Sequence, residues 1–180
     1  AAVQHLGAEG IVDSDPTHRP SPVHPRVLRM GDVMHDNALH FGSTFPLDQA
    51  SKGPVLLTMH RPSNVDDGPR LLSWLDAIED WLTSRQLEVI WPVHPRTAQS
   101  LDLHRPDWRK ELGNRGWKLE EPLGYLNLLK CIHAAPLVLT DSGGVQKESF
   151  SLGTRCVVLR DSTEWTERSM VTCKLNSYAI

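Results

Sequence analysis

The sequence predicts an α/β fold built on a doubly wound, Rossmann-like parallel sheet, and two features support this prediction. Short, continuously apolar runs alternate with longer stretches of helical periodicity, as expected for parallel strands that helices bury on both faces. Polar residues follow directly after several of these runs, where ligands of such sheets bind. Because crossovers between parallel strands are right-handed, the alternation produces a doubly wound arrangement.

The first elements follow a proline-rich segment, residues 15–25, which we interpret as a long loop or linker. Residues 27–30 are a short strand candidate, and residues 32–41 form a helical stretch. Residues 55–59 are a candidate buried strand. The clearest helix comes next, with Pro69 at its first position. Its apolar residues recur at helical spacing on one face: Leu71, Leu72, Leu75, Ile78, Trp81 and Leu82.

The second half of the chain continues the alternation of strands and helices. Residues 87–91 predict a strand that Pro92 ends, and weaker helical pieces follow through Leu112. The remaining elements are expected as a strand over 117–119, a helix over 123–135, a strand over 136–140, a turn over 141–144, a helix over 145–152 and a strand over 155–159.

The composition of the 180 residues is that of an ordinary folded domain. Hydrophobic residues make up 39% and charged residues 23%, which excludes disorder as the whole description. The net charge of −3, from 19 Lys and Arg against 22 Asp and Glu, offers no basic surplus for nucleic acid. No apolar run approaches the roughly 18 residues of a membrane span. We therefore expect neither nucleic acid nor a membrane as a partner.

The three cysteines, Cys131, Cys156 and Cys173, are odd in number and share no close spacing. This pattern favours neither a disulfide framework nor a zinc site, and it indicates a reducing, cytoplasmic compartment. His18 and His24 also lack metal-ligand spacing, so we expect no metal. The amino terminus has no signal-peptide pattern and no initial Met, and we expect the chain to begin inside a longer protein.

Three segments that follow strands are unusually polar. The first, residues 58–64, offers an imidazole, a guanidinium and an amide through His60, Arg61 and Asn64. Arg61 can hold a phosphate or carboxylate through two parallel hydrogen bonds. His60 can donate to an anion or exchange a proton. A loop that only caps the next helix explains the same residues equally well.

The second segment, residues 92–97, again brings a His and an Arg, His94 and Arg96, directly after a strand. Its two prolines stiffen the backbone and hold the directions of these side chains. A rigid structural turn is the somewhat favoured alternative.

The third segment, residues 140–148, opens a helix with Ser142, Gly143 and Gly144. Glycines let a ligand approach the backbone, and a helix amino terminus offers unpaired N–H groups and the positive end of the dipole. The segment therefore predicts a phosphate site, although it matches neither the P-loop nor the GxGxxG pattern. Glu148, one turn into the helix, is suited to accept hydrogen bonds from two sugar hydroxyls. A plain helix with Ser142 as N-cap is the alternative.

The order of the motifs is more informative than any one of them. The chain reads Thr-x-His-Arg-x-x-Asn, Pro-Val-His-Pro, Glu-Pro-Leu-x-Tyr, Leu-Thr-Asp-Ser-Gly-Gly-Val-Gln-x-Glu and Leu-Arg-Asp-Ser-Thr-Glu-Trp. This series resembles the C-terminal half of the non-hydrolysing UDP-N-acetylglucosamine 2-epimerases, from near residue 1 to about Glu167. The Asp-Ser-Gly-Gly-Val-Gln stretch with Glu148 is the most specific part of the resemblance.

The resemblance implies one half of a two-domain GT-B fold, in which UDP lies between the domains and is held mainly by the C-terminal one. It implies that Ser142, Gly143 and Gly144 cradle the diphosphate. It also implies that Glu148 holds the ribose hydroxyls and that Tyr125 lies near the uracil.

For the first two polar segments the resemblance implies roles around the sugar. It implies that His60 is the catalytic residue and that it faces the phosphates and sugar together with Arg61. It also implies that Asn64 supports the loop and that His94 lies near the cleft. The implied reaction interconverts UDP-GlcNAc and UDP-ManNAc by loss and re-addition of UDP, with general acid–base groups and without a cofactor. The key carboxylates of that reaction belong mainly to the N-terminal domain.

The sequence departs from the family pattern at two places. Gly124 stands where the family usually carries Asp, and Thr166 replaces a Pro after Trp165. Residues 168–180 do not align with the family, and its closing helices are missing. We interpret these residues as a diverged tail.

We therefore expect residues 1–180 to form a single nucleotide-sugar-binding domain, with residues 1–26 as a lead-in segment and the N-terminal GT-B domain absent. Its function would be the UDP-binding half of an epimerase that makes precursors of cell-surface polysaccharides, inactive without the other half. Two alternatives stay open: a non-catalytic module for UDP or UDP-sugars, and the donor domain of a glycosyltransferase. The expected protein partner is a second copy or a chain carrying the N-terminal domain.

Overall fold

The computed structural model describes residues 6–15, 17, 19, 21, 27–28, 31–46, 53–160 and 171–172. The chain divides into two compact units, Ala1–Val33 and Met34–Ile180. Whether residues 1–180 act as one domain stays a prediction. No described helix has the length and apolar character that crossing a membrane requires.

In the first unit, Ser14 and Val27 are joined by two hydrogen bonds. The backbone N–H of Ser14 donates to the Val27 carbonyl at 2.9 Å, and the N–H of Val27 donates to Ser14 Oγ at 2.7 Å. Both backbone groups of Val27 are thereby used outside any strand ladder. The strand expected at residues 27–30 is therefore wrong at Val27 and Leu28, and the rest of it lies outside the described residues.

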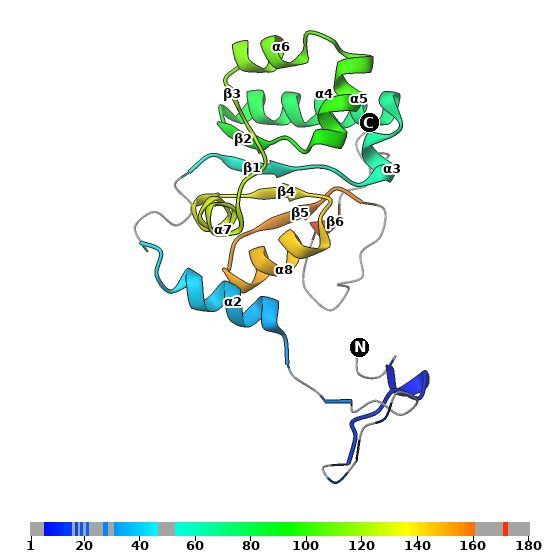
Figure 1. Cartoon of the computed structure of the whole chain (residues 1–180). Helices are drawn as coiled ribbons and strands as arrows, with labels where there is room; N and C mark the ends of the chain where they lie inside the picture. The colour runs from blue at the N-terminus through cyan, green and yellow to red at the C-terminus, as the bar shows by residue number, and fades with distance from the viewer. Residues whose placement is uncertain are drawn as a thin grey trace. The chain divides into compact units, whose positions relative to one another are not determined.

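The second unit is built on a six-stranded sheet with the order β3-β2-β1-β4-β5-β6 (Figure 1). The strands are β1 Val55–Thr58, β2 Val89–Pro92, β3 Trp117–Glu120, β4 Val138–Thr140, β5 Cys156–Val158 and β6 Val171–Thr172. All neighbouring strands are parallel. The doubly wound parallel sheet is thus confirmed, and its direction of winding reverses between β1 and β4.

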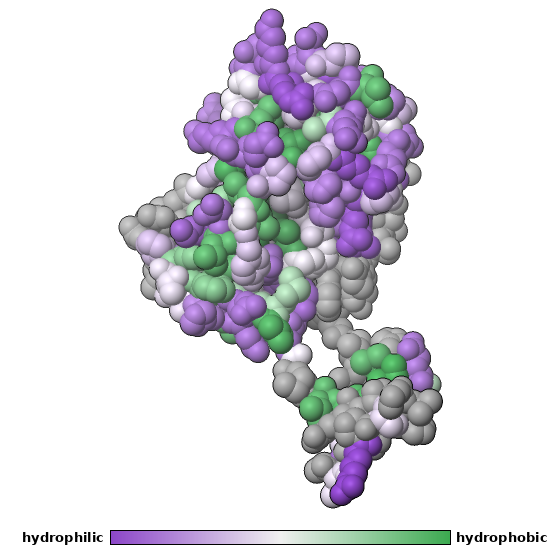
Figure 2. Space-filling view, viewed as in Figure 1, coloured by the Kyte–Doolittle hydropathy of each residue, from purple (hydrophilic) through white to green (hydrophobic). Residues whose placement is uncertain are grey.

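Helices cover the sheet on both faces (Figure 1). They are α2 Val33–Gly42, α3 Pro62–Val65, α4 Gly68–Arg85, α5 Pro95–His104, α6 Trp108–Asn114, α7 Tyr125–Ala134 and α8 Gly143–Ser151. Successive residues of a strand point to opposite faces. Accordingly, Leu57 packs in the core with α4 to α6, and Leu56 packs in the core with α2, α7 and α8. Figure 2 shows mainly hydrophilic residues on the outer surface over α4 to α6.

The helix expected after Pro69 is confirmed as α4. The Asp67 side chain caps it by accepting the N–H of Arg70 at 3.2 Å, and Gln86 ends it in the left-handed conformation with φ 54°. Trp74 is buried in the core. Trp81 is only partly buried and packs against the core from outside.

Three details differ from the sequence prediction. Gly143 and Gly144 are the first two residues of α8 rather than part of a turn, because Ser142 caps the helix directly before them. The short helix α3 lies inside the first polar segment. A sixth strand, β6, lies in the part of the chain interpreted as a diverged tail. The Leu-Arg-Asp-Ser-Thr-Glu-Trp motif beyond Arg160 lies outside the described residues, as do Thr166 and Cys173.

Candidate functional site

The first and third polar segments meet where the sheet reverses its winding. Thr58 ends β1 and lies opposite Thr140, which ends β4. Their hydroxyl oxygens are 2.5 Å apart, and the Thr140 hydroxyl accepts the N–H of Ser142 at 2.9 Å. The segment after β1 and the amino terminus of α8 are therefore held side by side at the carboxyl edge of the sheet, where such folds bind ligands.

The carboxylate of Asp141 joins these two segments. Asp141 is fully buried, and its Oδ2 accepts the backbone N–H groups of His60 at 3.0 Å and of Arg61 at 2.8 Å. The Asn64 amide donates to the same oxygen at 3.1 Å. The sequence predicts Asp141 as part of a turn and of the Asp-Ser-Gly-Gly-Val-Gln motif, without a role of its own. The sequence feature that could have indicated its role is an acidic residue placed between a buried strand and a helix N-cap.

The imidazole of His60 is the titratable group of this edge. Its Nδ1 lies 3.5 Å from Asp141 Oδ1, and its side chain is 36% exposed. Burial lowers the pKa of His60, the Asp141 carboxylate opposes that shift, and His94 and Arg61 lower the pKa further. The ring is therefore neutral at pH 7, with one nitrogen able to accept a proton and the other able to donate one.

Arg61 and Asn64 use their side chains differently. The Nε of Arg61 is buried and has no hydrogen-bond partner in the described part of the chain. The Asn64 amide is fully buried, donates to the Leu159 carbonyl at 2.7 Å, and accepts from Arg70 Nε at 3.3 Å. With Asp141 as a further acceptor, all of these contacts of Asn64 are internal, which is the geometry of loop support.

The second polar segment reaches the same edge with His94. Its ring centroid lies 5.4 Å from that of His60. His94 is also the N-cap of α5, because its Nδ1 accepts the N–H of Arg96 at 3.1 Å. The Arg96 guanidinium donates to both carboxylate oxygens of Asp66, at 2.7 and 2.6 Å, and holds the pKa of that carboxyl below its usual value. The Arg96 side chain is thus used in a local ion pair, as the alternative of a rigid structural turn predicts. His94 both caps α5 and lies close to the His60 ring.

The amino terminus of α8 is the place where the sequence predicts a phosphate. Ser142 caps the helix by accepting the Val145 N–H at 3.5 Å. The N–H groups of the first helical turn, those of Gly143 and Gly144 included, lack acceptors within the helix itself. A Cβ atom on Gly144 would lie 3.3 Å from Met34 Cε, so the backbone here is also closely packed. The helix contributes its positive end next to His60 and Arg61.

Glu148 and Tyr125 lie near one another beyond this terminus. Glu148 is 5% exposed, and burial raises the pKa of its carboxyl while Lys147 opposes the shift. Tyr125 begins α7, is 40% exposed, and has its pKa raised by burial and then by the charge of Glu148. Its ring meets that of Phe41 edge-on at 6.3 Å. The two residues expected on the nucleoside side are thus brought together.

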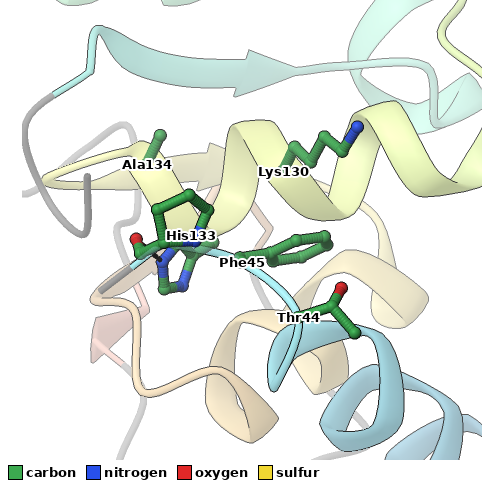
Figure 3. A pocket seen from close by; sticks show the side chains of 6 residues that line it. Thr44, Phe45, Lys130, His133 and Ala134 are labelled. Atoms are coloured by element: carbon green, nitrogen blue, oxygen red, sulfur yellow. Dashed lines mark hydrogen bonds between the residues drawn. The ribbon is translucent and has the colours of Figure 1, made fainter. Parts of the chain in front are cut away.

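Two cavities are found among the described residues. One, of about 430 Å³, is bounded by α7 and the segment after α2, and His133 Nε2 contacts the Pro46 carbonyl at 3.1 Å there (Figure 3). The other, of about 540 Å³, is an apolar groove between α4 and strands β4 and β5. Neither is lined by a residue expected at the site.

Metal and thiol chemistry have little support in the described residues. They contain no group of three or more His, Cys, Asp or Glu side chains arranged to hold a metal ion. Cys131 and Cys156 are free, and burial raises the pKa of both thiols, that of Cys156 to about 11. Neither is a thiolate at neutral pH, as expected for unreactive cysteines.

Comparison with known proteins gives concordant matches. The family model for UDP-N-acetylglucosamine 2-epimerase matches residues 2–176. The UDP-2,3-diacetamido-2,3-dideoxy-D-glucuronate 2-epimerase of Pseudomonas aeruginosa is 41% identical over 158 residues, which cover 84% of this chain and 41% of that protein. The UDP-N-acetylglucosamine 2-epimerase of Methanocaldococcus jannaschii is 40% identical over 112 residues, covering 62% of this chain and 30% of that protein.

Solved structures agree with these matches. The crystal structure of the Methanocaldococcus jannaschii UDP-GlcNAc 2-epimerase in complex with UDP-GlcNAc and UDP superimposes with a TM-score of 0.75 at 29% identity. The match covers 96% of this chain and 48% of that one. This chain therefore spans less than half the length of the relatives it matches, and it corresponds to their C-terminal part.

Proposed function

This chain belongs to the UDP-N-acetylglucosamine 2-epimerase family, and from that premise we propose that it is the UDP-binding half of a nucleotide-sugar 2-epimerase. The observation that carries the proposal is the meeting of His60 and Arg61 with the amino terminus of α8 at the point where the sheet reverses. A positive helix end and a guanidinium beside a neutral imidazole suit a ligand that carries a diphosphate next to a reactive sugar.

Each predicted site residue has a role in this proposal. The N–H groups at Ser142, Gly143 and Gly144 bind the diphosphate, and Arg61 binds it from the β1 side. Glu148 accepts hydrogen bonds from the ribose hydroxyls. Tyr125, close enough for the charge of Glu148 to raise its pKa, lies beside the uracil. Support comes from the place of Glu148 in α8, after Ser142, Gly143 and Gly144, and from the effect of its charge on Tyr125.

The proposed reaction inverts the sugar at C2. The proton at C2 is removed, the bond between C1 and the UDP oxygen breaks, and a 2-acetamidoglucal forms; UDP then adds back at C1 while a proton returns to the other face of C2. Fixed donors at α8 and Arg61 stabilise the charge that develops on departing UDP. Neutral His60 moves a proton at Nε2, and we place the remaining acid–base carboxylates outside this chain.

The sugar is not determined by this half alone. Relatives in the comparison act, by their names, on UDP-N-acetylglucosamine or on a UDP-diacetamido-glucuronate. Both substrates share the UDP moiety that the proposed site would hold. We take interconversion of UDP-GlcNAc and UDP-ManNAc as the first candidate. Epimerisation of the diacetamido-uronate is the second candidate, favoured by the 41% identity to the Pseudomonas enzyme.

We also propose that the protein works in the cytoplasm on precursors of cell-surface polysaccharides, and that it acts with an N-terminal domain or as a homodimer. A non-catalytic UDP-binding module and a glycosyltransferase donor domain remain the competing functions. Calorimetry with UDP and UDP-GlcNAc tests binding, with micromolar-to-millimolar affinity expected. An NMR assay for UDP-ManNAc, with and without an added N-terminal domain, separates enzyme from module. Turnover by this chain alone would contradict the proposed division of labour.

A further inference from the structure

We propose that Asp141 is a positioning residue whose buried carboxylate fixes the backbone of His60 and Arg61 and directs Nδ1 of the His60 ring. In the neutral ring this leaves the lone pair on Nε2. The inference deepens the proposed function, because it rests on His60 as the group that moves a proton.

The contacts of Asp141 are those of a shared anchor. Its Oδ2 accepts two consecutive backbone N–H groups, those of His60 and Arg61, together with the Asn64 amide. Its Oδ1 accepts the His60 N–H at 3.1 Å and lies 3.5 Å from His60 Nδ1. The loop after β1 therefore takes its position from a side chain that follows β4.

A carboxylate suits this position better than an amide. Each named partner of the Asp141 side chain is an N–H donor, apart from the His60 ring, which can be donor or acceptor. Asp141 has 0% of its surface exposed, so these donors replace water around its charge. An asparagine has the same shape but offers only one acceptor oxygen. Its NH₂ group, a donor, would face one of the N–H groups that the carboxylate now accepts.

The same geometry selects a tautomer of His60. An ionised carboxylate can only accept, so the neutral imidazole keeps its proton on Nδ1 and its lone pair on Nε2. The titratable and charged groups that act on the ring are Asp141 after β4, His94 at the start of α5, and Arg61 on the same segment. Asp141 is the one of these three that favours the charged ring.

Asp141 also links the two halves of the site. It directly precedes Ser142, the N-cap of α8. One residue thereby sets the distance between the His60 ring and the helix terminus proposed for the diphosphate. A proton-transfer group and a leaving-group site must keep such a fixed relation for elimination of UDP.

The test is nitrogen-15 NMR of the imidazole rings in the full chain without nucleotide. His60→Gln identifies the His60 signals by their loss. Above the pKa of the ring, the wild type should show the Nδ1–H tautomer. Asp141→Asn should shift the population toward Nε2–H, lower the titration midpoint of His60, and speed exchange of the His60 and Arg61 amides roughly tenfold or more.

Asp66→Asn is the matched control, because it removes a carboxylate near the same edge that pairs with Arg96 and that, in the described part of the chain, is not among the charges acting on the His60 ring. It should leave the His60 tautomer and both amides unchanged. An Nε2–H tautomer in the wild type would overturn the inference even if Asp141→Asn fails to fold. An unchanged tautomer in a folded Asp141→Asn protein would overturn it as well. Failure of the wild type to bind UDP would sink the proposed function but leave these readouts intact.

Discussion

Replacing Glu148 with alanine should weaken UDP binding selectively through the ribose. The Glu148 carboxylate is 5% exposed, so water competes poorly for its oxygens once a ligand is bound. A hydrogen bond to a charged group contributes about 1.5–3 kcal/mol. Loss of one such bond raises the Kd for UDP by about tenfold to a hundredfold, since 1.4 kcal/mol is about a factor of ten.

Calorimetry with three ligands makes this prediction specific. UDP should lose affinity for Glu148→Ala, 2′-deoxy-UDP should lose less, and inorganic pyrophosphate should bind as before. Lys147→Ala, at the neighbouring and less buried position of α8, is the matched control and should not distinguish UDP from pyrophosphate. An equal loss for UDP and pyrophosphate in Glu148→Ala would refute the ribose assignment.

Three further predictions concern stability and titration. Burial raises the pKa of Glu148 in the folded chain above 4.5, the value of the unfolded chain, so the free energy of unfolding falls as pH rises from 4.5 through the folded pKa. Glu148→Gln has no carboxyl to ionise. Urea unfolding should therefore show it gaining stability relative to wild type at pH 7 and little at pH 4. Leu75→Ala, at a fully buried core position, should cost about 2–5 kcal/mol in the same assay, and a cost under 1 kcal/mol would contradict the packing. His94→Gln removes a group that lowers the pKa of His60, so the NMR titration midpoint of His60 should rise; a fall would contradict the ring contact.

Much of the fold follows from local patterns in the sequence. The apolar run from Val55 is a strong signal because β1 buries both of its faces, one in each core. The helical repeat from Leu71 to Leu82 is strong because α4 buries one face in the core that it shares with Leu57. The strand expected at Val27 failed because its backbone groups are bonded to Ser14, thirteen residues away, which no local pattern records. Strand β6 is only two residues long and offers no period to detect.

The site was predictable where a motif follows a strand and unpredictable where strands bring distant residues together. His60, Arg61 and Ser142 stand directly after apolar runs, and parallel topology places such residues at one edge. Asp141 acts on His60 across 81 positions of sequence, through the pairing of β1 with β4. The pairing of Arg96 with Asp66 likewise depends on a tertiary contact, between the start of α5 and the end of α3.

Amide NMR during a UDP titration tests the central claim most directly. If the diphosphate binds at the start of α8, the largest shifts should fall on Gly143 and Gly144, with His60 and Arg61 next. Shifts centred on the pocket around Phe45 and His133, or no saturable shifts at all, would contradict the account.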